Sequence, residues 1–286
     1  MYICGQGNLL SKIDRMAESD KFPRFILLIG DYGFGKKVIS EYIADRLSAM
    51  FVPCSIDVDS VRSAITDSLV VGVKTVYAFF DCDNMSLGAK NALLKAIEEP
   101  EKNAYFIMTA RNPYMLLGTI LSRGTVFNMD AYSPGDISEY MKYYTEIKGI
   151  EVVPDKKKLI EAISVCPNDI ITYINSNVDE IYDLADKFIQ FIGDASIANE
   201  LKITGKLKLK QDGDGIDPVA FLRCVLVCCN KLILNDPSGY DTKIFYMITK
   251  RTADAITEIT KNGANKKIVI DNYIINLHID IAGGVS

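Results

Sequence analysis

The stretch FILLIGDYGFGKKVISEYIADRL, from Phe25 to Leu47, decides the fold. Its apolar run, Phe25 to Ile29, is followed by a glycine-rich turn, and beyond that turn apolar residues recur at the three- and four-residue spacing of a helix. The stretch therefore predicts a buried strand, a loop and a helix in immediate succession.

Two further apolar runs repeat this order. Val76 to Phe80 ends at Asp81 and leads to a predicted helix from Ala89 to Glu99, and Tyr105 to Ala110 follows as the next strand. Strands separated by helices indicate a parallel sheet covered on both faces, with ligands at the carboxyl ends of the strands. We therefore predict an α/β domain over residues 1–130.

The remainder of the chain changes character after Asp130. Apolar residues keep helical spacing there, and no comparable strand pattern occurs. We expect a small helical lid over residues 131–178 and an all-helical domain over residues 179–286.

Composition excludes several classes of protein. The 286 residues are 49% hydrophobic and 24% charged, which is ordinary for a globular chain, and no apolar run approaches the length of a membrane span. The single histidine, His278, rules out histidine dyads and multi-histidine metal sites. A net charge of −5 argues against tight DNA binding by the chain alone. We expect a cytoplasmic protein with no membrane partner.

The glycine-rich turn has the spacing of a phosphate-binding loop. Gly30, Gly35 and Lys36 fit the pattern G-x-x-x-x-G-K, and Gly33 lies inside it. Backbone N–H groups, the helix dipole and the lysine would together hold phosphate there. Lys37 stands where the pattern has Ser or Thr, whose hydroxyl would ligate magnesium. The alternative is a plain turn that needs glycine, and the sequence leaves ATP occupancy open.

Four separate segments carry a resemblance to a known family. They are Asn91–Lys95 (NALLK), Glu98–Pro100 (EEP), Thr109 and Thr119–Arg123 (TILSR), in this order and after the phosphate loop. Together they resemble the bacterial clamp-loader subunits of DNA polymerase III, the gamma/tau and delta-prime family. The resemblance covers the first 130 residues, and it implies an AAA+ P-loop domain, a helical lid and a helical collar that holds the subunits of a ring together.

The family's acidic pair is incomplete in this sequence. Active members place adjacent Asp and Glu at the end of a strand, where they hold magnesium and polarise water. An ungapped alignment from Ser86 and Asn91 puts Phe80 and Asp81 at those places, and a one-residue gap puts Asp81 and Cys82 there. In either alignment only one carboxylate remains.

Two sensor positions of the family also map onto this chain. Thr109 matches the sensor at the end of the third predicted strand, although a polar strand end is the simpler alternative. The lid segment Cys166–Ile171 (CPNDII) lies where active members carry a sensor arginine, and it contains none. Phosphoryl transfer depends on positioned cations, so these losses together predict a site that does not hydrolyse ATP.

The arginine of the family's Ser-Arg-Cys element is retained. Ser122, Arg123 and Gly124 match that element except at its last residue. In the family this arginine reaches the nucleotide of a neighbouring subunit as an arginine finger. We therefore expect Arg123 to act in trans, although a lone solvated arginine is the alternative.

A degenerate own site beside a retained finger is similar to delta-prime. The resemblance implies gamma/tau-like and delta-like subunits as partners, together with the sliding clamp, and with primer-template DNA through the complex. Two alternatives stay open, a gamma-like ATPase in which Asp81 alone carries magnesium and an unrelated P-loop nucleotide kinase. Cys54 stands alone where family members commonly carry a zinc insertion, so we expect no zinc.

Overall fold

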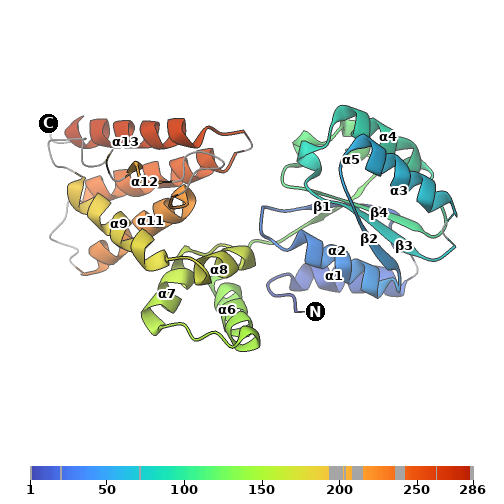
Figure 1. Cartoon of the computed structure of the whole chain (residues 1–286), viewed down its shortest axis with the longest axis horizontal. Coiled ribbons are helices and arrows are strands. Elements are labelled where there is room, and N and C mark those ends of the chain that lie inside the picture. The colour runs from blue at the N-terminus through green and yellow to red at the C-terminus, as the bar shows by residue number, and fades with distance from the viewer. Residues whose placement is uncertain are drawn as a thin grey trace. The chain divides into compact units, whose positions relative to one another are not determined.

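The computed structural model describes residues 2–19, 21–70, 72–192, 202, 204–207, 215–235, 242–261 and 263–283. Stretches 193–201, 208–214 and 236–241 of the predicted collar lie outside them. The chain divides into two compact units, Met1–Gly149 with Val165–Ile171 and Ile150–Ser164 with Thr172–Ser286 (Figure 1). These units cross the boundaries expected at residues 130 and 178, and the three-domain division stays a prediction.

The sheet in the described part of the first unit has five strands in the order β2-β3-β4-β1-β5, and every neighbouring pair is parallel. The strands are β1 (Phe25–Ile29), β2 (Met50–Cys54), β3 (Thr75–Phe79), β4 (Ala104–Ala110) and β5 (Thr125–Asn128). The predicted parallel α/β fold is confirmed.

The two edge strands are the ones that sequence analysis does not single out. Residues of β1, β3 and β4 are buried throughout, whereas β2 has no fully buried residue and β5 has only Phe127. Pro53 lies within β2, where its missing N–H is tolerated because an edge strand pairs on one side only.

Helices cover both faces of the sheet (Figure 1). On one face, α1 (Gly7–Glu18) and α2 (Lys36–Arg46) pack against alternate residues of the strands. On the other face lie α3 (Val58–Val70), α4 (Leu87–Glu98) and α5 (Gly118–Leu121). Two short 3-10 turns, η1 (Cys82–Asn84) and η2 (Pro113–Met115), follow β3 and β4.

Local capping residues fix where α4 and α6 (Pro134–Lys148) begin. The Ser86 hydroxyl accepts a hydrogen bond from the Ala89 N–H at 3.2 Å. Ser133 and Asp136 form a reciprocal capping box ahead of α6. α8 (Pro167–Ile174) follows later in the chain, with residues in both compact units.

The second unit is helical in the part that the structure describes. Its helices are α7 (Pro154–Ile163), α9 (Val178–Phe191), α11 (Pro218–Asn235), α12 (Thr242–Ile259) and α13 (Lys266–Gly283). Cys224, Cys228 and Cys229 of α11 are buried, as packing residues are.

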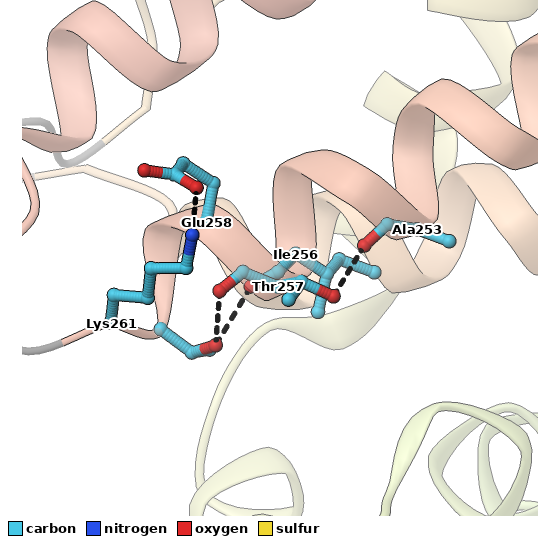
Figure 2. A network of polar contacts seen from close by, with 6 residues as sticks. Ala253, Ile256, Thr257, Glu258 and Lys261 are labelled. Atoms are coloured by element: carbon cyan, nitrogen blue, oxygen red, sulfur yellow. Dashed lines mark hydrogen bonds and ion pairs between the residues drawn. The ribbon is translucent and has the colours of Figure 1, made fainter.

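Side-chain bonds to the helix's own carbonyls mark the end of α12 (Figure 2). The Thr257 hydroxyl donates to the Ala253 carbonyl at 3.0 Å, and the Thr260 hydroxyl donates to the Ile256 carbonyl at 2.9 Å. Lys261 pairs with Glu258 one turn back, where a cation favourably meets the negative end of the helix dipole.

Gly124, between α5 and β5, lies unusually close to β1. A Cβ atom at this position would lie 2.6 Å from Cγ of Leu27, which is fully buried. The family's cysteine would not fit here without a shift of the Leu27 side chain. The absence of a side chain therefore lets the chain turn closely around β1.

We expect Gly124→Ala to lower the free energy of unfolding by about 1–3 kcal/mol, because overpacking displaces a buried leucine. Gly118→Ala is the matched control, since a Cβ there meets no atom within 4 Å. Urea unfolding followed by circular dichroism measures both variants. Equal stability of the two variants would contradict the close approach.

Candidate phosphate-loop site and surface arginine

The phosphate loop connects β1 to α2 in the geometry that its glycines allow. Gly33 and Gly35 have φ of +80° and +86°, a left-handed conformation that favours glycine, and Gly35 caps the N-terminus of α2. The Gly30 N–H donates to the Ala110 carbonyl at 3.1 Å, and a Cβ on Gly30 would lie 2.9 Å from Cβ of Met129. The glycines thus serve backbone conformation and close packing as well as any phosphate.

Lys36 is folded back onto its own loop. Its ammonium donates to the Gly30 carbonyl at 2.7 Å and to the Asp31 carbonyl at 2.9 Å, and the residue is 8% exposed. Burial lowers the pKa of Lys36, while the carboxylates of Asp81 and Asp83 oppose that shift. In this conformation the cation that would hold phosphate is satisfied internally.

The lid segment Cys166–Ile171 lies against the phosphate loop. A Cβ on Gly33 would be 2.6 Å from the Cys166 Sγ and 2.8 Å from the Asn168 Cβ. The segment that sequence analysis identified as lacking a sensor arginine therefore does reach the loop. It brings a thiol and an amide side chain there, and burial raises the pKa of the Cys166 thiol to about 11.

Lys37 points away from this arrangement. Its side chain is 65% exposed and lies 4.0 Å from the Glu41 carboxylate, one turn along α2. Such an exposed pair adds little stability, and an ammonium offers no oxygen to a magnesium ion.

Asp81 and Thr109 meet at the carboxyl ends of β3 and β4. Asp81 has a left-handed backbone, with φ of 53°, and its N–H donates to the Thr109 hydroxyl oxygen at 3.1 Å. Thr109 is fully buried. Its hydroxyl is thus engaged with the neighbouring strand end, and its role as a phosphate sensor stays a prediction.

Asp83 is a site residue that sequence analysis missed. Its two carboxylate oxygens accept the N–H groups of Arg111 at 2.9 Å and Asn112 at 3.1 Å, and it is only 7% exposed. A second carboxylate thus lies two residues beyond Asp81, but both oxygens bind the backbone that follows β4. The signal in the sequence was the D-C-D spacing directly after a buried strand.

Two further residues near the loop also escaped the sequence patterns. The Tyr132 hydroxyl donates to the Phe34 carbonyl at 2.7 Å, and the two rings lie edge to face at 5.3 Å. The Gln6 side chain bonds both the N–H and the carbonyl of Asp130 at 2.9 Å. These contacts tie the phosphate loop and the N-terminal segment to the chain leaving β5.

Arg123 lies at the amino-terminal ends of the strands, whereas the phosphate loop lies at their carboxyl ends. It immediately precedes β5, whose first residue pairs in parallel with Ile26 near the start of β1. The phosphate loop follows the end of β1, which is roughly 16 Å further along for a five-residue strand. The Arg123 side chain is 36% exposed and is paired with Glu98 at 2.7 Å. Arg123 therefore cannot serve the phosphate loop of its own chain.

Metal-binding groups do not gather in the described residues. No three Cys, His, Asp or Glu side chains there could hold a metal ion. The expected absence of zinc stays a prediction. No helix among the described residues is long and apolar enough to cross a membrane.

The parallel sheet and the glycine-rich loop after β1 together give the chain the fold of an AAA+ P-loop domain. The chain superposes on RuvB from Thermotoga maritima, the Holliday junction branch migration motor, with a TM-score of 0.54 over 96% of this chain and 88% of that one, at 16% identity. This likeness concerns the fold alone.

Sequence comparison narrows the class. Residues 54–133 match the family model described as DNA polymerase III, delta subunit. The DNA polymerase III subunit delta' of Haemophilus influenzae is 34% identical over 82 residues, which are 29% of this chain and 25% of that protein. The subunit tau/gamma of the same organism is 23% identical over 247 residues, covering 75% of this chain and 34% of that protein.

The chain is therefore similar in sequence to the delta' and tau/gamma subunits of DNA polymerase III, as the resemblance predicted. It spans only about a quarter to a third of the length of these two relatives.

The thiols of the chain provide a test of how far burial suppresses their ionisation. Burial raises the pKa of each cysteine above its ordinary value of 9.0, to about 11 for Cys4, Cys54, Cys166 and Cys228 and to about 12 for Cys82, Cys224 and Cys229. We expect almost no reaction with a thiol reagent at pH 8 in the folded chain, and reaction of all seven thiols after denaturation.

Because unfolding restores ordinary thiol pKa values, the stability that these thiols contribute is fully present below pH 9 and lost as the pH rises from about 9 to about 12. Lys36, whose pKa is lowered, acts in the opposite sense, whereas tyrosines such as Tyr42 and Tyr77, whose pKa burial raises, act in the same sense as the thiols. Melting curves across that pH range measure the effect. Stability that rises over this pH range would contradict the raised thiol pKa values. Stoichiometric zinc in the purified chain would contradict the expectation that it holds no zinc.

Proposed function

We propose that this chain is a delta-prime-like subunit of a DNA polymerase III clamp loader that does not itself hydrolyse ATP. It supplies Arg123 as an arginine finger to the nucleotide of a neighbouring gamma-like subunit. The observation that carries the proposal is the position of Arg123. Its side chain is exposed at the amino-terminal end of β5, remote from the chain's own phosphate loop at the carboxyl end of β1.

The state of the chain's own loop supports the same assignment. Lys36 bonds two loop carbonyls, Lys37 faces solvent, and the segment packed on Gly33 carries no arginine. Asp83, which could have supplied a second carboxylate, binds backbone N–H groups with both oxygens. Each of these features removes a cation or a metal ligand that phosphoryl transfer requires.

In this role the chain acts in the cytoplasm within a ring of clamp-loader subunits. Its partners are gamma/tau-like and delta-like subunits and the sliding clamp, and it meets primer-template DNA through the complex. The helical second unit contributes to the collar of the ring. The chain has no resident zinc, and ATP is not required at its own loop.

The first test concerns Arg123. In a complex reconstituted with a competent gamma-like ATPase, Arg123→Ala should lower DNA-dependent turnover at the shared interface by about 10³-fold or more, the usual effect of losing an arginine finger. Arg62→Ala is the matched control, since Arg62 is an exposed arginine of α3 paired with Asp59. Turnover is measured as phosphate release. If both variants match wild type, the proposed finger is wrong.

The second test concerns the chain's own loop. Lys36→Met should leave the turnover of the assembled complex within about twofold of wild type, because no transition state forms at this loop. Lys37→Met serves as the control for loss of a neighbouring positive charge, and circular dichroism melting checks that both variants fold.

The outcome also separates the alternatives. A large loss with Lys36→Met, together with ATP hydrolysis by the purified chain that clamp and primed DNA stimulate, would favour a gamma-like ATPase. Transfer of phosphate to a small nucleotide would favour a kinase.

A further inference from the structure

The Arg123 guanidinium is held between the C-terminal ends of two helices. Its Nη2 lies 2.7 Å from Oε1 of Glu98, the last residue of α4. Its Nη1 donates to the Thr119 carbonyl of α5 at 2.8 Å and makes a long contact of 3.4 Å with the Ser122 hydroxyl. Two of its nitrogens are thus fixed by two separate elements.

The position of Glu98 is unfavourable for the helix that carries it. Glu98 and Glu99 are consecutive carboxylates at the C-terminus of α4, where the last carbonyls already carry partial negative charge. A cation favours such a place, and Arg123 supplies it. The pairing with Arg123, and not helix stability, accounts for a carboxylate at residue 98.

The backbone on either side of Arg123 is fixed as well. Gly124 packs against Leu27 of β1, and the Arg123 N–H donates to the Ile120 carbonyl at 3.2 Å. With the backbone fixed and two nitrogens anchored, the side chain is held in one orientation before any partner binds. Its Nε–H has no hydrogen-bond partner among the described residues.

We propose that Glu98 is a positioning residue for Arg123, and this inference rests on the proposed function. The carboxylate orders the long side chain in advance. The entropy cost of ordering Arg123 is therefore not added when it contacts the triphosphate of a neighbouring subunit. The pair is half exposed, with Glu98 46% accessible, so the attraction is weak enough for the guanidinium to move toward phosphate.

The test is a double-mutant cycle in the reconstituted complex. Glu98→Ala should lower kcat for ATP at the shared interface by about 10-fold with KM within about twofold, because only the positioning of the finger is lost. Glu98→Gln should fall between Glu98→Ala and wild type, since the amide oxygen can still accept from Nη2. Glu99→Ala, at the adjacent exposed residue, is the matched control and should behave as wild type.

In an Arg123→Ala background, Glu98→Ala should cause no further loss, because the residue acts only through the arginine. An additive loss would overturn the inference, and so would unchanged or raised kcat in Glu98→Ala while Arg123→Ala lowers it. An inert Arg123→Ala would instead overturn the proposed function itself. Melting curves of each variant confirm that the chain is folded.

Discussion

The pairing of β1 with β4 on one side and β5 on the other sets where the phosphate loop and Arg123 lie. Ile29 at the end of β1 is paired with Ala110 of β4 and Asn128 of β5. Ile26, near the start of β1, is paired with Thr125 of β5. Because these strands are parallel, the phosphate loop lies at their carboxyl ends and Arg123 lies at their amino-terminal ends. A slip of one residue in β1 would exchange the side chains packed against α1 and α2 with those packed against α3 to α5, so the register is strongly held.

At the carboxyl ends of the strands, backbone groups form hydrogen bonds with the charged side chains beside the phosphate loop. Lys36 donates to carbonyls, and Asp83 accepts from the N–H groups that follow β4. Buried charges are costly without such partners, so this end of the sheet is stable without phosphate. An incoming phosphate would have to draw Lys36 away from its carbonyls, which weakens the benefit that the ammonium could offer it.

The sequence predicted the features that depend on local pattern. The strand, glycine loop and helix from Phe25 onward follow from apolar runs and glycine spacing, and the structure has them. The edge strands β2 and β5 were missed, because Pro53 and partial exposure remove the unbroken apolar pattern of a buried strand.

The missed parts of the candidate site depend on contacts between distant segments. Asp83 binds residues that lie beyond the next strand, and no local pattern states which backbone a carboxylate will meet. The position of Cys166 on Gly33, and of Glu98 beside Arg123, likewise follows only from how the elements pack. The resemblance includes Glu98 in its EEP segment, but it assigns a role to the arginine and none to that carboxylate.

Gly124 has a chemical consequence besides its close packing. A cysteine at this position would place an oxidisable sulfur atom one residue from the arginine. With glycine, the backbone beside Arg123 has no oxidisable atom. The surface that carries the arginine is therefore indifferent to oxidants at this position, whatever the redox state of the cell.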